Sequence, residues 1–508
     1  MNLADLVREA ARRSPDKPAL LYRDSSMTWG ELEWHVSVTA SGLAALGLQA
    51  GDRVAIQLGN TPGFVVSYFG TLRGGFVAVP VNTGYTAAEL AHVLGDSGAA
   101  AVVCTRSAAP TMLDLKRDLP SLREVVVSDA AEAPEGTTSL DAVGERGDTL
   151  GTATYPRGGD DLAVLIYTSG TSGRPKGAML SHRALTANLD QCTAITPPVV
   201  QEDDVVLLVL PLFHIYGLNP GLGMVAKAGA TGLLVERFDP VGTLDELRRH
   251  HVTNVPGAPP MYVAWSMLPD LSEAFASVRL LVSGAAPLPA QVLSSILERT
   301  GQHVFEGYGL TETAPVVTTT LMSEVAKPNS IGKPVPGVEI KIVDERGAEV
   351  EEEDPGEIVV RGANVFSGYW PDGHGGPDGE GWFPTGDVAY ADGDGDLFLV
   401  DRRKELILVS GFNVYPREVE DVLLRHADVQ EAAVLGVPHP YTGETVRALV
   451  VVRAGAQLSA EDVIAHCALS LARFKCPTSV EFVDELPHSA TGKVSKGRLR
   501  ENAGLLAR

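Results

Sequence analysis

The stretch Leu162-Ala-Val-Leu-Ile-Tyr167-Thr-Ser-Gly-Thr-Ser-Gly-Arg-Pro-Lys176-Gly177 joins an apolar strand to a loop of hydroxyl side chains and glycines that ends with a lysine. Glycines allow backbone N–H groups to turn toward an anion, hydroxyls add further donors, and the lysine adds positive charge. The GxxxxGK[ST] spacing of a Walker A loop is absent. A flexible surface linker would not be framed by an apolar strand and by Pro175-Lys176-Gly177. This stretch therefore predicts a phosphate-binding loop that directly follows a strand.

Helix-like and strand-like stretches alternate on both sides of this loop. The segments 53–58, 76–81 and 280–283 have the apolar character of buried strands, whereas 32–46 and 64–72 have helical patterns. Such alternation with apolar strands is typical of mostly parallel sheets that are covered by helices. The sequence therefore predicts an α/β fold.

From about residue 335 the pattern changes to short strands at close spacing, such as 338–343, 356–361 and 396–400. Turns of Gly, Pro and Asp separate them, which predicts a small antiparallel sheet or barrel. A charged run, Asp401-Arg402-Arg403-Lys404, comes next. The remaining chain, about 105 residues, is long enough for a separate α+β unit. We place the domain boundary between Asp401 and Arg402, which gives domains of residues 1–401 and 402–508.

Composition excludes several classes of protein. The 508 residues carry 41 Lys and Arg against 64 Asp and Glu, a net charge of −23. Because nucleic acids and anionic membranes are bound mainly by Lys and Arg, neither is an expected partner. The four cysteines are scattered, and Asp5, Arg8 and Glu9 stand where a signal peptide would be apolar. The longest apolar run is about half of a bilayer span. We expect a cytoplasmic protein without an integral membrane span.

Further segments carry residues suited to nucleotide chemistry. In Gly307-Tyr308-Gly309-Leu310-Thr311-Glu312-Thr313, an aromatic ring between glycines can stack on a base, and Thr311 can donate to a phosphate. Glu312 can hold Mg²⁺ together with phosphate oxygens. In Phe383-Pro384-Thr385-Gly386-Asp387 the carboxylate can accept hydrogen bonds from ribose hydroxyls. The segments 401–420 and 487–496 complete the set.

Other motifs have simpler explanations. Residues 221–226 match GxGxxA, but no strand leads directly into them, so a Rossmann site is not supported. Asp392-Gly-Asp394-Gly-Asp396 has Leu397 where a calcium loop requires glycine, and it predicts a hairpin turn. Tyr262 and Trp265 are expected in the core or in a pocket wall.

Taken together and in this order, the five chemical segments resemble those of the acyl-adenylate-forming superfamily, which includes acyl-CoA synthetases, 4-coumarate–CoA ligases and beetle luciferase. The resemblance runs from Thr28-Trp29-Gly30-Glu31-Leu32 to Lys493. It implies a large N-terminal domain of two helix-flanked, mostly parallel sheets plus a small β-barrel. It also implies a small mobile α+β C-terminal domain that acts as a lid.

The resemblance implies roles for individual residues. The loop around the ATP phosphates would consist of Thr168, Ser169, Gly170, Thr171, Ser172 and Lys176. Tyr308 would stack on adenine, Thr311 would contact the α-phosphate, and Glu312 with Thr168 would hold Mg²⁺. Asp387, assisted by Arg402, would bind the ribose. Lys493 would be the catalytic lysine and Lys404 would lie at the hinge between the domains.

The same resemblance implies an acyl pocket and a path for CoA. His214 would lie beside the acyl carboxylate, and the pocket would also include Gly284, Ala285, Gly307, Pro315 and Val316. The face that receives CoA in the second half-reaction would include Ser410, Gly411 and Phe412. There Gly411 would let the backbone pass close to a pantetheine arm.

The resemblance implies an ATP-dependent ligase that forms an acyl-adenylate, releases pyrophosphate and transfers the acyl group to CoA. Malonate-activating relatives typically carry Arg at the position of Gly307, so a dicarboxylate is disfavoured. The segment 213–219 is similar to 4-coumarate ligases, whereas 411–416 is similar to bacterial fatty-acyl ligases. We expect an apolar monocarboxylic acid, with a fatty acid favoured over an aryl acid.

Two alternatives remain open from the sequence. A stand-alone adenylating enzyme could load a carrier protein instead of CoA. A catalytically silent sensor of nucleotides or acyl-adenylates is a different class, against which the intact Lys493, Glu312 and Asp387 argue.

Overall fold

The structure, a computed structural model, describes residues 2–130, 132–148, 154–168, 175–269, 271–402, 405–409, 412–439, 443–488 and 493–502. The chain divides into two compact units. The larger unit comprises Met1–Pro328, Gly332–Glu339 and Arg361–Phe383. The smaller unit comprises Asn329–Ile331, Ile340–Val360 and Pro384–Arg508. Short strands that precede residue 401 therefore group with the C-terminal residues, and the boundary at Asp401 stays a prediction.

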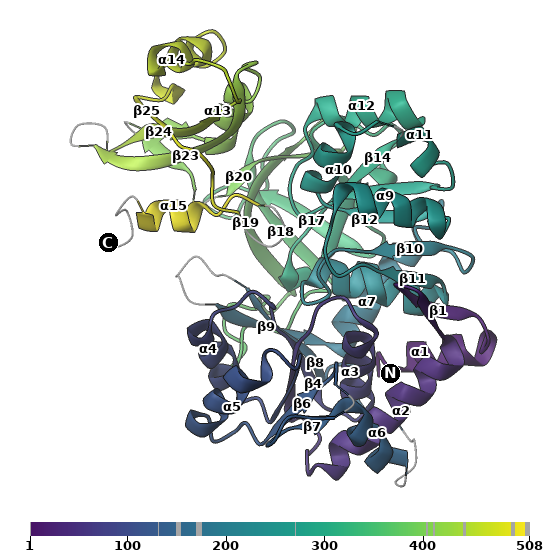
Figure 1. The fold of residues 1–508 in the computed structure, drawn as a ribbon. Coiled ribbons are helices and arrows are strands. Elements are labelled where there is room, and N and C mark those ends of the chain that lie inside the picture. The colour runs from purple at the N-terminus through teal and green to yellow at the C-terminus, as the bar shows by residue number, and fades with distance from the viewer. Residues whose placement is uncertain are drawn as a thin grey trace. The chain divides into compact units, whose positions relative to one another are not determined.

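The first sheet of the larger unit is mostly parallel. Its strands in spatial order are β7 (Thr138–Ser139), β6 (Glu124–Val127), β5 (Ala101–Cys104), β3 (Arg53–Gln57), β4 (Val77–Pro80), β8 (Leu162–Thr168) and β9 (Lys176–Ser181). Neighbours pair in parallel, except that β9 returns antiparallel to β8. Helices α4 (Ala87–Ser97) and α5 (Ala109–Asp118) pack on one face of this sheet, and α3 (Pro62–Arg73) packs on the other (Figure 1). The predicted α/β alternation is confirmed.

A second sheet of the larger unit carries most of the remaining strands. In spatial order they are β15 (Val316–Thr319), β14 (Val304–Gly309), β13 (Leu280–Ser283), β12 (Asn254–Gly257), β10 (Val205–Leu208), β11 (Thr231–Leu234), β1 (Pro18–Tyr22) and β2 (Ser25–Thr28). Pairing is parallel except at the two ends, β1 with β2 and β14 with β15. The helices that accompany this sheet are α9 (Pro240–Arg249), α10 (Pro259–Ser266), α11 (Leu271–Ala274) and α12 (Ala290–Thr300) (Figure 1).

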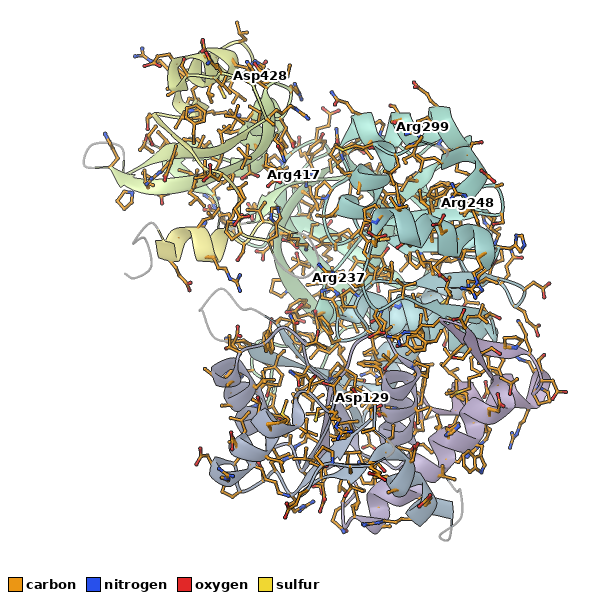
Figure 2. All side chains as sticks on the ribbon, viewed as in Figure 1. Asp129, Arg237, Arg248, Arg299, Arg417 and Asp428 are labelled. Atoms are coloured by element: carbon orange, nitrogen blue, oxygen red, sulfur yellow. The ribbon has the colours of Figure 1, made fainter. Side chains whose placement is uncertain are left out.

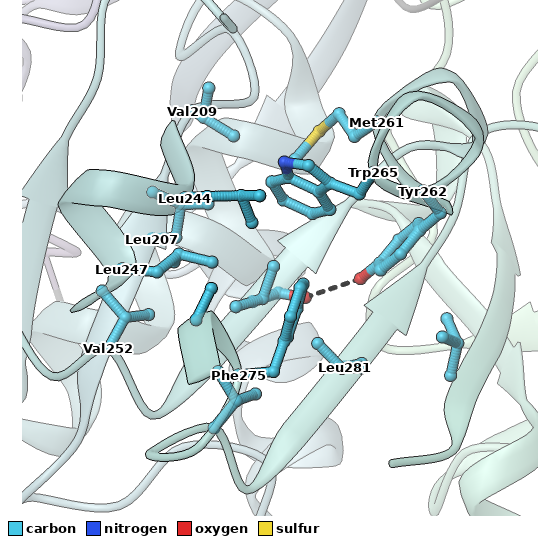
Figure 3. Packing of buried hydrophobic residues seen from close by; sticks show 14 of the residues in the cluster. Leu207, Val209, Leu244, Leu247, Val252, Met261, Tyr262, Trp265, Phe275 and Leu281 are labelled. Atoms are coloured by element: carbon cyan, nitrogen blue, oxygen red, sulfur yellow. Dashed lines mark hydrogen bonds between the residues drawn. The ribbon is translucent and has the colours of Figure 1, made fainter. Parts of the chain in front are cut away.

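The core beneath these helices is centred on an aromatic cluster. Trp265 is fully buried and meets Tyr262 and Phe275 edge to face, with ring centroids 5.7 and 5.5 Å apart. The Tyr262 hydroxyl donates to the Val255 carbonyl at 3.0 Å (Figure 3). A buried tyrosine needs such a partner, because an unpaired hydroxyl in an apolar core is costly. Both Tyr262 and Trp265 are therefore core residues.

The other helices of the larger unit include α1 (Asp5–Arg13), α2 (Trp29–Ala45), α6 (Leu140–Asp148), α7 (His182–Thr193), the π-helix Gly217–Gly223 and α8 (Met224–Ala228).

The N-terminal residues are attached to the rest of this unit through buried polar groups. The Leu3 N–H donates to Nδ1 of His182 at 3.1 Å, and the Arg73 guanidinium donates to the Ala4 carbonyl at 2.8 Å. Burial lowers the pKa of His182 to about 4. His182 is therefore a neutral acceptor at pH 7.

The short strands after residue 329 follow one another in the order β17 (Val338–Val343), β18 (Gly356–Gly362), β19 (Trp382–Ala391), β20 (Leu397–Arg402) and β16 (Ser330–Pro334). β19 and β20 form an antiparallel hairpin. In its turn, the Asp392 carboxylate accepts from the N–H groups of Asp394 and Asp396 at 3.1 and 3.0 Å. The predicted hairpin turn is confirmed.

The C-terminal part of the smaller unit is an α+β sandwich. Its strands are β22 (Phe412–Val414), β21 (Ile407–Val409), β24 (Gly443–Val452), β23 (Val429–His439) and β25 (Ser479–Phe482), and its helices are α13 (Pro416–Leu423), α14 (Ala460–Ala468) and α15 (Lys496–Asn502). Val419 and Val422 of α13 and Val463 of α14 belong to one apolar cluster with residues of the sheet. Arg417 of α13 and Asp428, which Figure 2 labels, are both half-buried. Within the described residues, no helix combines the length and apolar character needed to cross a membrane.

Candidate active site

The predicted phosphate loop connects two neighbouring strands of the first sheet, β8 and β9. Thr168 ends β8 and pairs in antiparallel register with Lys176, which begins β9 and is exposed. Nε2 of His92 in α4 lies 3.0 Å from the Pro175 carbonyl oxygen just before Lys176. Ser169, Gly170, Thr171 and Ser172 lie outside the described residues. The two ends of the loop are thus fixed by the sheet.

Tyr369 connects the lysine of this loop to the predicted metal ligand. The Lys176 ammonium lies 5.5 Å from the centre of the Tyr369 ring, within the range of a cation–π interaction. The Tyr369 hydroxyl donates to Oε1 of Glu312 at 2.6 Å. Lys176 and Glu312 are far apart in the sequence, and the structure brings them to the same aromatic side chain. Tyr369 was missed from the sequence, because Gly368-Tyr369-Trp370 carries no charged or phosphate-binding group.

The segment 366–370 also holds the two motifs together through its backbone. The Trp370 N–H donates to the Gly177 carbonyl at 2.8 Å, and the Phe366 N–H donates to the Glu312 carbonyl at 2.8 Å. Between them, Met179 of β9 exchanges backbone hydrogen bonds with residues 367 and 368. One segment therefore fixes the position of Glu312 relative to β9.

Buried amide side chains hold the turn 311–316 from the other side. Asn219 and Asn364 each donate to a carbonyl of this turn at 2.7 Å. Asn188 donates to the Val316 carbonyl at 2.8 Å and accepts from the Val316 N–H at 3.1 Å. All three amides are buried, where hydrogen bonds are strong and an unmade one is costly. The turn that carries Thr311, Glu312, Pro315 and Val316 is therefore rigidly placed.

Tyr308 and its flanking glycines lie on β14, opposite β15. Tyr308 is buried and pairs with Thr318 in the ladder. A Cβ atom on Gly309 would lie 2.0 Å from the Pro315 carbonyl oxygen, so the backbone requires glycine there. A Cβ atom on Gly307 would meet only the Thr318 carbonyl oxygen, at 3.5 Å, which is an ordinary contact. The fold therefore does not require glycine at position 307, and its absence of a side chain leaves space beside β14.

Gly284 and Ala285 follow β13 and receive the ring of Tyr216. A Cβ atom on Gly284 would lie 2.9 Å from Cε1 of Tyr216, so glycine allows the ring to pack on the backbone. Ala285 has a left-handed backbone with φ of 76°, and burial raises the pKa of the Tyr216 hydroxyl. The Tyr216 N–H donates to Nδ1 of His214 at 3.2 Å, which orients that imidazole. Tyr216 thus contacts both His214 and Gly284.

Glu306 is a second residue that the sequence did not single out. Its side chain is buried, and Oε1 accepts from the Leu288 N–H at 3.0 Å. Its backbone N–H donates to the Thr320 hydroxyl at 2.9 Å, and its carbonyl accepts from the Thr319 hydroxyl at 3.0 Å. Glu306 therefore ties the segment that follows Gly284-Ala285 to the strand that carries Tyr308. In the sequence Glu306 is an ordinary glutamate, and only its burial and its partners in the structure mark it.

The remaining described site residues belong to the smaller unit. Asp387 is buried in β19, opposite Arg402 of β20 in the antiparallel ladder, and its N–H donates to the Thr385 hydroxyl at 3.1 Å. Lys493 is exposed and precedes Val494, which bridges to His488. Lys404, Ser410 and Gly411 lie outside the described residues, as do the side chains of Arg402 and Phe412. Their predicted roles stay predictions.

The resemblance implies a bound Mg²⁺, so the described residues must offer ligands that suit this ion. Across the described ranges, no three His, Cys, Asp or Glu side chains gather in a way that could bind a metal. Glu312 offers a carboxylate, which is the single ligand that Mg²⁺ accepts when phosphate oxygens and water complete its shell. The residues therefore fit an ion that is shared with a triphosphate rather than a metal site made by protein alone.

The chain matches two described families in succession, AMP-binding enzyme over residues 7–370 and AMP-binding enzyme C-terminal domain over residues 418–493. It is 37% identical to a long-chain-fatty-acid–CoA ligase of Yersinia pestis, over 98% of this chain and 94% of that protein. It is also 37% identical to a feruloyl-CoA synthase of Amycolatopsis sp., over 97% of both chains. The crystal structure of ATP-bound MatB from Rhodopseudomonas palustris superimposes with a TM-score of 0.90 at 35% identity and covers 99% of each chain.

Fold and site thus define an adenylate-forming enzyme with a large α/β unit and a smaller C-terminal one. The chain belongs to the AMP-binding enzyme family. The predicted class, an AMP-forming acid–thiol ligase of the acyl-CoA synthetase type that uses ATP and CoA, is confirmed.

Proposed function

We propose that this ligase activates an apolar monocarboxylic acid, and in particular a fatty acid, and transfers the acyl group to CoA. The observation that carries the proposal is the link from Lys176 through Tyr369 to Glu312, which joins a phosphate-binding cation to a metal-binding carboxylate. Such a pair suits a triphosphate whose α-phosphorus is attacked by a carboxylate. Catalysis of that attack depends mainly on positioning and on stabilising charge.

In the first half-reaction, the acid attacks the α-phosphate in line and pyrophosphate leaves. We assign the β- and γ-phosphates to Lys176 and the loop from Thr168 to Ser172, the adenine to Tyr308, and the ribose to Asp387 with Arg402. Thr311 contacts the α-phosphate, and the Lys493 ammonium stabilises the charge that grows on its oxygens. His214 lies beside the acyl carboxylate.

Glu312, with Thr168, is the proposed holder of Mg²⁺. The ion would supply positive charge to the phosphate oxygens when bound. The chain's own contribution is orientation, because the Tyr369 hydroxyl fixes one carboxylate oxygen at 2.6 Å and the Phe366 N–H fixes the Glu312 carbonyl at 2.8 Å. Removing Mg²⁺ with a chelator should abolish adenylate formation.

In the second half-reaction, the CoA thiol attacks the acyl-adenylate and AMP leaves. Lys493 is then no longer needed, since no phosphorus is attacked. We assign the pantetheine path to Ser410, Gly411 and Phe412, and the hinge that exchanges the two faces of the lid to Lys404. Lys493→Ala should therefore abolish adenylation and leave thioester formation from supplied acyl-adenylate largely intact.

The choice of acid rests on the pocket wall. Gly307 leaves space without charge, which disfavours a second carboxylate, and Pro315, Val316 and Ala285 add further uncharged surface. Relatives of equal identity are named for long-chain fatty acids and for feruloyl groups, so an aryl acid is the second candidate. Its support is Tyr216, whose ring on Gly284 offers a flat surface for another ring.

Pyrophosphate exchange over a panel of acids tests the proposal. Saturated fatty acids of graded length should support exchange better than cinnamate-like acids, and malonate should support none. Exchange with aryl acids alone would transfer the assignment to an aryl ligase, and exchange with no acid would favour a silent sensor. Supplying CoA or a carrier protein next identifies the acceptor: if adenylate forms but CoA never releases AMP, the CoA assignment is wrong.

The location of the protein is also a proposal. All four cysteines lie among the described residues, where each is a buried free thiol. Reduced, scattered thiols are typical of the cytoplasm, which is the compartment that we propose.

A further inference from the structure

Lys496 is a nearly buried cation between two carboxylates of the smaller unit. Its ammonium lies 3.1 Å from Oε2 of Glu405 and 2.8 Å from Oε1 of Glu420. The side chains are 12%, 21% and 15% exposed for Lys496, Glu405 and Glu420, respectively. Burying charges to this degree is costly unless they are paired. The cluster is therefore a specific contact rather than a mobile surface ion pair.

The partners of Lys496 come from separate parts of the fold, and one is itself held in place. Glu405 directly follows the predicted hinge residue Lys404. Glu420 lies in α13, and its Oε1 also accepts from the Val434 N–H of β23 at 2.7 Å. The Lys496 ammonium is thus held both by Glu405, near the start of the C-terminal part, and by Glu420, which is itself hydrogen-bonded to the central sheet.

The position of Lys496 in its helix makes stabilisation of that helix a poor explanation. Lys496 is the first residue of α15, where a cation opposes the helix dipole. Apolar contacts already attach the helix, because Leu499 packs with Leu486, Leu435 and Leu449 on the sheet. A neutral residue at 496 would serve the helix at least as well, so the charge at 496 needs another purpose.

Lys496 stands three residues after Lys493, next to backbone contacts that join residues 494–495 to residues 487–488. The Ser495 N–H donates to the Pro487 carbonyl at 2.7 Å, and Val494 bridges to His488. On the N-terminal side of this segment, Nε2 of His488 lies 3.3 Å from Oε2 of Glu431 on β23. The loop 487–495 is therefore anchored at both of its ends, and Lys496 is the anchor on the side of Lys493.

We propose that Lys496 is a positioning residue for adenylation: its contacts with Glu405 and Glu420 fix the loop that presents Lys493. The inference rests on the proposed role of Lys493. A misplacement of a catalytic group by about 1 Å costs on the order of a hundredfold in rate. Loss of this anchor should therefore impair the half-reaction that uses Lys493 and spare the half-reaction that does not.

A purely structural role predicts something different. Removing the ammonium leaves two carboxylates facing each other, and a destabilised lid would then fail in both half-reactions together. The two roles are separated by measuring pyrophosphate exchange and thioester formation from supplied acyl-adenylate on the same full-length variants.

The test compares Lys496→Met and Lys496→Arg with a matched control. Lys475→Met removes an ion pair of similar geometry in the same unit, Lys475 with Glu418 at 2.7 Å, which joins the 3-10 helix Arg473–Lys475 to α13. We expect exchange to fall about tenfold or more in Lys496→Met, with thioester formation within about threefold of the parent. Lys496→Arg should restore most of the exchange, and Lys475→Met should change neither rate by more than about threefold.

Several outcomes would overturn the inference. Equal loss of both rates in Lys496→Met, unchanged exchange, or no rescue by Arg would each contradict it. Lys493→Ala, run in parallel, tests the proposed function by itself: if that variant exchanges normally, the role of Lys493 fails, whatever Lys496 does. Should Lys496→Met not fold, Glu405→Gln removes one charge at constant size. It should reduce exchange alone, and unchanged exchange in that variant would refute the inference.

Discussion

Removing the Tyr369 hydroxyl tests whether this residue orients Glu312. Tyr369→Phe keeps the ring beneath the Lys176 ammonium and deletes only the donor that lies 2.6 Å from Oε1 of Glu312. The Glu312 carboxylate would then be free to leave the position that this hydrogen bond gives it. We expect the rate of pyrophosphate exchange to fall, with little change in thermal stability.

The magnitude follows from the type of hydrogen bond. A hydrogen bond to a charged acceptor contributes about 1.5–3 kcal/mol. Because about 1.4 kcal/mol corresponds to a factor of ten in rate, Tyr369→Phe should lower kcat for exchange by roughly tenfold to a hundredfold. Tyr369→Leu, which also removes the ring from Lys176, should lose a further threefold or so, since an exposed cation–π contact contributes about 0.5–1 kcal/mol.

A double-mutant cycle with Glu312→Ala identifies the route of the effect. If Tyr369 acts through Glu312, then Tyr369→Phe should change exchange by less than about threefold when the carboxylate is already absent. Tyr390→Phe, at a tyrosine that stacks on Phe398 in the β19–β20 hairpin, is the matched control and should be neutral. The reasoning is refuted if Tyr369→Phe costs the same in the presence and absence of Glu312, or costs nothing in the parent enzyme.

Three further predictions concern Gly307 in the proposed acyl pocket, the buried Glu306, and His182, which accepts a hydrogen bond from the N-terminal residues. Gly307→Leu should fold, because a Cβ atom at position 307 would make only an ordinary contact with the Thr318 carbonyl oxygen. It should lower exchange with long acids far more than with acetate; equal loss for both acids would contradict a pocket role. Glu306→Ala leaves the buried Leu288 N–H without its acceptor and should lower the free energy of unfolding by about 1–3 kcal/mol, whereas Glu306→Gln should retain most of it in denaturant titrations. The folded-state pKa of His182, about 4, lies below its usual value of 6.5. The unfolded state therefore binds more protons between these values, and stability should fall by up to about 3 kcal/mol as pH drops from 6.5 to 4. His182→Gln should show a flatter profile, and an unchanged profile would exclude His182 as the cause.

The sequence predicted the α/β class and the family, because each depends on local pattern. Apolar strands, glycine spacing and the order of five motifs are all present in the chain itself. The hairpin turn at 392–396 followed from the same local evidence, whereas for Tyr262 and Trp265 the sequence left the core and a pocket wall open and the structure places both in the core.

Other residues of the site could not be found in this way. Tyr369 has no chemical signature in its own segment, and its importance arises only because segment 366–370 pairs with β9 and with the Glu312 carbonyl. Glu306 and Lys496 are ordinary charged residues in the sequence. Their significance depends on burial and on partners that lie far away along the chain, such as Glu405 and Glu420.

The sequence by itself determined which chemical groups this protein possesses and the order in which they occur. The tertiary structure decided which of them meet: it brought Lys176 and Glu312 to one tyrosine and placed Lys496 between two carboxylates. The physical reason is that local backbone preferences and residue chemistry are written in short windows of sequence. A long-range contact depends instead on how sheets and helices pack, which no short window contains.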